Sequence, residues 1–240
     1  MRKKLLICND DPGIGQAIEK SFNATQYTVY NCTMCYNDLE KNLNGKEKYD
    51  TVVFFVGEHV NDLTNRIRRL RDQYSKVHKD VDIFVVMMYK WEHNEEKYYL
   101  AGASMCLWFQ ETPAWLLEEY IKLFMYRRKF PYLDEKISEF LTFHGYAHFY
   151  KGFCYLCQLL SIFLKEPEKL KLDMKDNYQE IAVKYGDGKA DNVKRNLETY
   201  CKEIYKSPHV DPLLKQSFSR KPELVEFIRW MYDFVSQSYY

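Results

Sequence analysis

The segment 176–205, DNYQEIAVKYGDGKADNVKRNLETYCKEIY, decides the architecture of the C-terminal half of the chain. Apolar side chains recur in it at the spacing of a helical face, and two glycines, Gly186 and Gly188, interrupt that period. We therefore predict two helices joined by a tight turn, with Asp191 capping the start of the second. The apolar positions are Tyr178, Ile181, Ala182 and Tyr185 in the first helix and Val193, Leu197, Tyr200, Cys201 and Ile204 in the second.

The opposite face of the second predicted helix is polar. A helix with an apolar back and a front of amide and cationic side chains near its N-terminus is typical of proteins that read the DNA major groove. An ordinary surface helix with a solvated charged face gives the same pattern, so the segment by itself leaves both interpretations open. The polar face carries Asn192, Lys194, Arg195, Glu198, Thr199 and Lys202.

Composition restricts the class of protein. The 240 residues are 46% hydrophobic and 17% aromatic, which is enough for one large or two small domains. The formal net charge is only +1, so a nucleic-acid surface would have to be local. The apolar run after the basic start is too short for a secretory signal, and none approaches the roughly 18 residues of a membrane span. Seven scattered cysteines favour a reducing environment, and we expect a cytoplasmic protein with no membrane partner.

Strand and helix patterns alternate through the first 128 residues. Short apolar runs such as TVVFFV at 51–56 are typical of buried parallel strands, and amphipathic segments separate them. Five such alternations predict an α/β domain with a doubly wound parallel sheet. The expected strands are 5–8, 27–32, 51–56, 83–88 and 105–109, and the expected helices are 14–22, a weak one from 38, 63–74 and 115–128.

Catalytic motifs are scarce. A glycine turn, Gly13-Ile14-Gly15, follows the first strand, where such turns can hold a pyrophosphate at a helix N-terminus. Asp10 and Asp11 directly precede it and would repel phosphate, which argues against a dinucleotide site. We find no nucleophile–base pair or phosphate loop, and we predict a protein that is not an enzyme and needs no cofactor.

Two Cys-x-x-Cys pairs raise the alternative of a zinc site, since thiolates at this spacing can bind one tetrahedral ion. The pairs lie in different predicted domains, and the second falls in an apolar helical segment. We therefore favour core cysteines and no bound metal. The residues concerned are Cys32, Cys35, Cys154 and Cys157, with His144 and His148 near the second pair.

Residues 3–128 resemble the receiver domains of response regulators, through LLICNDDP, YDTVVFF and GASMCLWF. The resemblance implies an acidic pair after the first strand, a phosphorylated aspartate after the third, a hydroxyl after the fourth and a lysine after the fifth. Because most of these groups are replaced here, we interpret the domain as a degenerate receiver without aspartyl-phosphate chemistry. A slip in register would offer Glu58 as an acidic candidate. The corresponding positions are Asn9 and Asp10 with Asp11 beside them, then Phe55 (acceptor), Met87 (hydroxyl) and Phe109 (lysine).

The pattern changes at KFPYLD, residues 129–134, which we predict to be a linker. It would join the receiver-like domain, 1–128, to a domain of helices only, 135–240. Pro222 is expected at the first position of the last helix. The further helices expected are 137–141, 149–164, 213–218 and 222–234.

Four ordered blocks in the second domain resemble the effector domain of the sporulation response regulator family. They are HGYAHFYKGFCYL, NYQEIAVKYG, NVKRNLETYCKEIY and KPELVEFIRWM, and the match covers about residues 137–236. The resemblance implies DNA binding, with 176–185 as the positioning helix and 191–205 as the recognition helix of a helix-turn-helix. Arg195 matches an arginine of the family's recognition helix and is the base contact we carry over. Lys189 and Lys194 are expected at phosphates, and Asn192 is a second candidate for a base contact.

The leading hypothesis is a transcriptional regulator that binds double-stranded DNA and whose receiver-like half does not signal by phosphorylation. That half would instead supply a homodimer surface or bind a regulatory protein. The alternative is a protein-interaction adaptor that keeps the two-domain fold without binding DNA, which the low net charge and the acidic residues near the recognition helix favour slightly.

Overall fold

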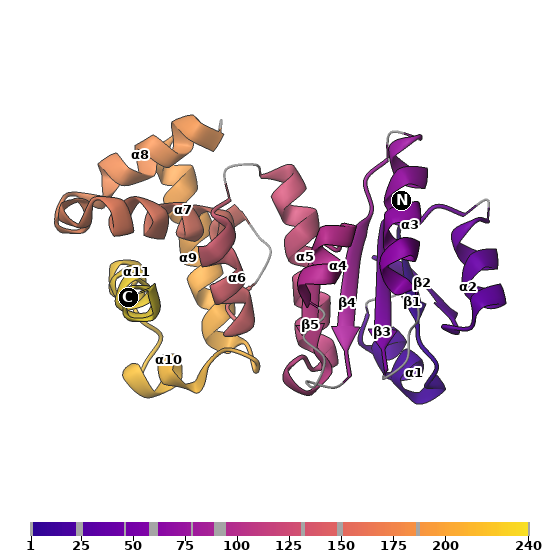
Figure 1. Cartoon of the computed structure of the whole chain (residues 1–240). Coiled ribbons are helices and arrows are strands. Elements are labelled where there is room, and N and C mark those ends of the chain that lie inside the picture. Colours follow the sequence, from indigo (N-terminus) through magenta and orange to yellow (C-terminus); the bar gives the residue numbers. More distant parts are fainter. Residues whose placement is uncertain are drawn as a thin grey trace. The chain divides into compact units, whose positions relative to one another are not determined.

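The computed structural model describes residues 2–22, 26–45, 47–57, 62–77, 79–88, 95–130, 133–147, 151–185 and 188–239. The chain divides into two compact units, residues 1–121 and 122–240, which are coloured indigo to magenta and rose to yellow in Figure 1. Among the described residues, no helix is both long and apolar enough to cross a membrane.

The N-terminal unit is built on a five-stranded parallel sheet, as predicted. The strand order is β2-β1-β3-β4-β5, which is the doubly wound order of flavodoxin-like folds. Every residue of β3 and β4 is buried, because helices cover both faces of a sheet of this kind. The strands are β1 (Lys3–Cys8), β2 (Tyr27–Cys32), β3 (Thr51–Val56), β4 (Asp82–Met87) and β5 (Met105–Trp108).

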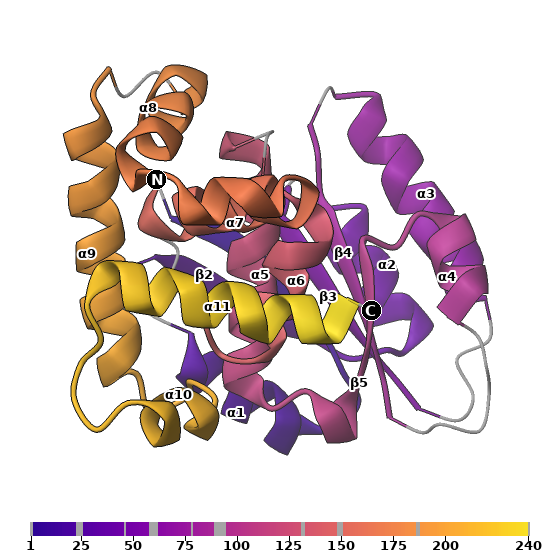
Figure 2. The ribbon, with the colours of Figure 1, turned by 90° about the vertical axis from the view of Figure 1, so that its left-hand side faces the viewer.

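Helices separate the strands, and Figure 2 shows α2, α3 and α4 together on one side of the sheet. Their apolar side chains join alternate strand residues such as Leu6, Val52 and Val85 in one buried cluster. The other face is covered by α1 and α5. The helices are α1 (Pro12–Ser21), α2 (Tyr36–Leu43), α3 (Leu63–Ser75), α4 (Glu95–Ala101), the 3₁₀ turn η1 (Phe109–Glu111) and α5 (Ala114–Lys129).

Several local expectations for this unit were wrong. The helix α4 was not predicted, because seven residues that begin with two glutamates show too little apolar period. The strand β4 ends at Met87 rather than 88, and β5 ends at Trp108, so that Phe109 opens η1 instead of closing the strand. The first helix begins at Pro12, whose fixed φ suits the first helical position, with Asp11 as its N-cap.

The C-terminal unit contains helices only among its described residues. Its centre is α7, which is buried from Gly152 to Phe163 on nearly all sides, as expected for a helix surrounded by others. Helices α8, α9 and α11 each pack against it. The elements are α6 (Glu135–Phe143), α7 (Lys151–Lys165), the 3₁₀ turn η2 (Pro167–Lys171), α8 (Met174–Tyr185), α9 (Ala190–Lys206), α10 (Pro212–Ser217) and α11 (Leu224–Tyr239).

The close approach of α7 and α9 depends on Gly152. A Cβ atom added there would lie 2.4 Å from the backbone oxygen of Asn196 and 2.6 Å from the Cβ of Tyr200. No side chain fits at such distances, so a glycine is required for the two helices to pack as they do. Gly152 therefore has a packing role in this fold.

Two capping predictions in this unit were wrong. The N-cap of α9 is Lys189 rather than Asp191, and the backbone N–H of Ala190 is bonded to the Gln179 side chain of α8, 3.3 Å away. Helix α11 begins at Leu224, so Pro222 precedes the helix instead of occupying its first position. In both cases the sequence period had located the start of the helix only to within one or two residues.

The cysteine prediction holds in three positions of four. Cys32, Cys154 and Cys157 are buried, whereas Cys35 is exposed at the N-cap of α2 and is not a core residue. His148 lies outside the described residues. Within the described ranges, no three His, Cys, Asp or Glu side chains gather as a metal site would require.

Candidate nucleic-acid interface and receiver pocket

Helices α8 and α9, which the sequence analysis assigned to a helix-turn-helix, pack against each other. The inner face of α9 is fully buried, with Val193, Leu197 and Ile204 each at 0% exposure. Gly186 and Asp187 of the turn lie outside the described residues. Gly188 has a φ of +73°, a left-handed conformation that glycine adopts without strain.

All six residues predicted to face DNA are exposed. Figure 2 shows α9 along one flank of the C-terminal unit, with α7 and α11 on its inner side. The boundary between the apolar and polar faces of α9 therefore lies where the helical period of the sequence predicted it. The exposed residues are Lys189 at the N-cap of α9 and Asn192, Lys194, Arg195, Glu198 and Thr199 on the helix itself.

Acidic and basic groups alternate on this face. Lys194 Nζ lies 3.9 Å from Glu198 Oε1, one helical turn away, and both side chains are more than half exposed. An exposed pair of this kind contributes only about 0.3–0.5 kcal/mol, so either side chain can leave it for another partner. The Thr199 hydroxyl donates to the Arg195 carbonyl at 3.0 Å, which turns it toward the helix backbone.

A cleft of about 310 Å³ runs beside the second half of this face, between α9 and the segment that leads into α11. Arg195 and Lys202 line it from α9, and Lys221 lines it from the opposite wall. The sequence analysis predicted no site role for Lys221. The three cations are partly balanced by Glu198 and Glu223, which also line the cleft.

The polar side chains of the loop after β1 all form hydrogen bonds to the backbone. The Asp11 carboxylate caps α1 by accepting from the Gly13 N–H at 2.7 Å. The Asp10 carboxylate accepts from the Met34 N–H at 2.8 Å, and the Asn9 side chain accepts from the Asp11 N–H at 3.0 Å. These three side chains thus fix the loops that follow β1 and β2.

The three other residues that the receiver resemblance assigns to a pocket lie at or directly after the ends of their strands and are hydrophobic. Phe55 lies one residue before the end of β3, Met87 ends β4, and Phe109 directly follows β5. Phe55 and Met87 are buried, each at 4% exposure. Glu58, the alternative acidic candidate, lies outside the described residues. A Mg²⁺ ion needs several carboxylate or other oxygen ligands, and this set of side chains does not provide them at the third to fifth strands.

No protein-family model matches the chain, and no curated protein matches it. Solved structures similar to it are receiver domains and response regulators. A CheY-like receiver domain protein from Methanospirillum hungatei is 17% identical, with a TM-score of 0.45 over 54% of this chain and 98% of that one. DrrB of Thermotoga maritima, an OmpR/PhoB homolog, is 17% identical, with a TM-score of 0.44 over 53% of this chain and 54% of that one. CheY4 of Vibrio cholerae is 17% identical, with a TM-score of 0.41 over 51% and 98%.

The strand order and the parallel pairing of all five strands define the fold of the N-terminal unit. The chain thus consists of a CheY-like receiver fold followed by a helical unit.

Proposed function

We propose that this chain is a DNA-binding transcriptional regulator of the sporulation response regulator type, acting in the cytoplasm. The observation that carries the proposal is the two-faced character of α9. Its inner face is completely buried against α7 and α8, while Asn192, Lys194 and Arg195 are exposed within its first two turns. The second helix of a helix-turn-helix presents its N-terminal residues to base edges in this manner.

The receiver-like unit takes a different role in this proposal. The receiver resemblance implies an aspartate and a lysine at the positions of Phe55 and Phe109. We therefore propose that the unit acts as a dimer surface or as a docking surface for a regulatory protein. The seven cysteines, none in a disulfide, suit a reducing compartment.

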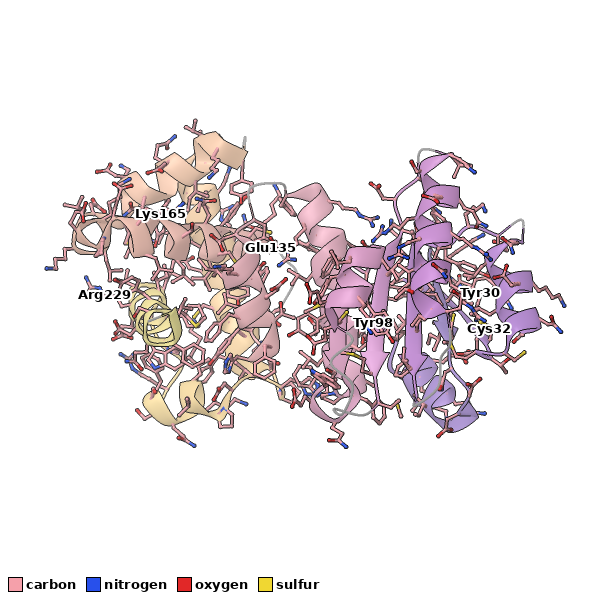
Figure 3. The ribbon with its side chains drawn as sticks, in the orientation of Figure 1. Tyr30, Cys32, Tyr98, Glu135, Lys165 and Arg229 are labelled. Atoms are coloured by element: carbon pink, nitrogen blue, oxygen red, sulfur yellow. The ribbon has the colours of Figure 1, made fainter. Side chains whose placement is uncertain are left out.

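A selection experiment tests DNA binding and finds the target sequence at the same time. The full chain is used to enrich duplexes from a random pool, and binding to the enriched and scrambled duplexes is then measured by fluorescence anisotropy at several salt concentrations. We expect an enriched sequence and an affinity that falls with salt. Arg229→Ala serves as a control, because Arg229 is exposed on α11, outside the cleft, and points away from the rest of its unit (Figure 3).

One observation favours the adaptor hypothesis. Glu198 lies on the exposed face of α9 beside Lys194 and would repel the DNA backbone. A failure to enrich any duplex, together with salt-independent and negligible affinity for random DNA, would contradict the proposed regulator and favour the adaptor.

A further inference from the structure

An apolar cavity of about 320 Å³ lies at the carboxyl ends of the strands, between α1 and α5. Figure 1 shows the arrowheads of β3 and β4 directed toward the end of the sheet at which α1 lies. The floor of the cavity is formed by Phe55 and Phe109, and its walls by Ile14 and Ala17 of α1 and Leu117 of α5. It therefore occupies the place where a phosphoryl pocket would be expected from the receiver resemblance.

The cavity exists because large and small side chains alternate around it. Phe55 and Phe109 fill the positions at the strand ends, whereas Gly13 and Ala17 on one side and Ala114 on the other leave space above the rings. Phe55 is only 4% exposed, so its ring is held firmly in the core while the space beside it stays open.

The charges of the lining restrict what it can hold. Asp11 is the single charged residue among the described lining residues, and its exposed carboxylate lies at the start of α1. No lysine, arginine or histidine is among them. The Asp11 carboxylate repels anions, and the described lining residues provide no cation to balance it, so phosphates and fatty acids are disfavoured relative to neutral or cationic ligands.

We propose that this cavity binds a small apolar molecule that is neutral or carries one amine. Three features support the assignment. The volume falls within the range of about 300–1,000 Å³ typical of ligand pockets, and the lining is mostly apolar. The site lies near the carboxyl ends of β3 and β4, beside the switch point between β1 and β3, and it is at this end of the strands that open α/β sheets bind their ligands. The proposal concerns the receiver-like unit alone and does not depend on DNA binding.

The test uses the full chain and a neutral fluorescent probe, N-phenyl-1-naphthylamine. We expect saturable fluorescence enhancement that Ala17→Phe weakens by about tenfold or more, because the new ring fills the cavity. Gln16→Phe is the matched control, since Gln16 is the preceding residue of α1, is exposed and does not line the cavity. Circular dichroism melting of both variants verifies that each is folded.

Competition then defines the ligand class. Nonylamine and 1-nonanol should displace the probe, and nonanoate should do so much less effectively. Asp11→Asn should reduce the difference between nonylamine and nonanoate, because asparagine can still cap α1 but carries no charge. Equal displacement by all three in the wild type, with no effect of Asp11→Asn, would overturn the assignment of charge preference.

Two other outcomes would overturn the proposal as a whole. Probe binding that Ala17→Phe and Gln16→Phe affect equally would place the probe elsewhere on the chain. No probe binding, together with a change of mass on Ala17→Phe in analytical ultracentrifugation, would show that a second copy of the chain covers this surface instead of a small molecule.

Discussion

The rings of Phe55 and Phe109 pack edge to face, with centroids 6.1 Å apart and planes at 77°. The receiver resemblance implies an aspartate and a lysine at these two positions. An aromatic contact of this geometry contributes about 0.5–1.5 kcal/mol beyond the area it buries. The end of β3 and the turn after β5 are thus joined by an apolar contact between two aromatic rings.

The first prediction follows from that contact. Incubation with acetyl phosphate and Mg²⁺ should leave the mass of the intact chain unchanged, because Phe55 offers no carboxylate nucleophile. Intact-mass spectrometry measures this directly. A stable added phosphate that disappears in Glu58→Gln or Asp10→Asn would mean that a neighbouring carboxylate acts as the acceptor and that the assigned register is wrong.

Gly152→Ala should destabilise the helical unit, although alanine is the better helix former. The added methyl group would meet the Asn196 carbonyl oxygen at 2.4 Å, and relieving that overlap requires α7 and α9 to separate. We expect a loss of about 1–3 kcal/mol or more, measured by urea unfolding followed by circular dichroism. Gly57→Ala is the control, since no atom of the described residues lies within 4 Å of a Cβ at Gly57. Equal stabilities of the two variants would refute a packing role for Gly152.

The last turns of α5 should stabilise the helical unit through Arg127. Its guanidinium bonds to Glu139 at 3.0 Å, to the Glu135 carbonyl at 2.7 Å and to the Ser138 hydroxyl at 3.1 Å, while its side chain is 16% exposed. Hydrogen bonds that involve a charged group contribute about 1.5–3 kcal/mol each at most, and less where solvent reaches them. A fragment of residues 122–240 should therefore melt higher than one of residues 134–240.

Calorimetric or circular dichroism melting of the two fragments provides the measurement, and Arg127→Ala in the longer one is the internal check. It should lower the melting temperature toward that of the shorter fragment. If the longer fragment and its Arg127→Ala variant melt together, the bonds of Arg127 do not contribute to the stability of this unit.

The Cys35 thiol should react with iodoacetamide before the other six cysteines. A hydrogen bond from the Thr33 side chain and another from the Asp38 backbone amide lower the pKa of Cys35, whereas burial raises the pKa of Cys154 to about 12. Because the thiolate is the reactive form, labelling of Cys35 should already be appreciable at a pH below the usual range for thiols. Peptide mapping as a function of pH locates the label, and Thr33→Val should shift the Cys35 profile to higher pH. An unchanged profile would exclude the Thr33 contribution.

Arg195 and Lys189 should affect DNA binding differently. We expect Arg195→Ala to weaken binding to the enriched duplex by about 1–3 kcal/mol and to change affinity for scrambled duplex little, because a base contact discriminates between sequences. Arg195→Lys should not restore binding, since lysine lacks the planar fork that spans two acceptors. Lys189→Ala should weaken both duplexes alike and reduce the salt slope by about one.

Anisotropy titrations on both duplexes distinguish these cases, with Arg229→Ala as the control for loss of one exposed positive charge. If Arg195→Ala leaves both affinities unchanged, or lowers both equally while the protein stays folded, Arg195 does not contact a base.

The sequence by itself determined the features that depend on local periodicity. The runs in β3 and β4 are apolar at every position after the first, because both faces of those strands are covered. This pattern can be recognised from the residues of each strand alone, whichever helices cover it. The faces of α9 could be assigned for the same reason, since residues three and four apart on a helix share a face in any environment. Helix α4 was not predicted because its four apolar residues, 98–101, are consecutive, so its seven residues show no helical period.

Only the tertiary structure decided the features that join residues distant in the chain. The contact of Phe55 with Phe109, the cavity between α1 and α5, the clash that requires Gly152 and the bonds of Arg127 to α6 each need the relative placement of separate elements. The first residue of α9 was likewise decided by a tertiary contact. Lys189 rather than Asp191 precedes α9 because Gln179 of α8 accepts the hydrogen bond of the Ala190 N–H, so a neighbouring helix replaces the cap that the sequence suggested.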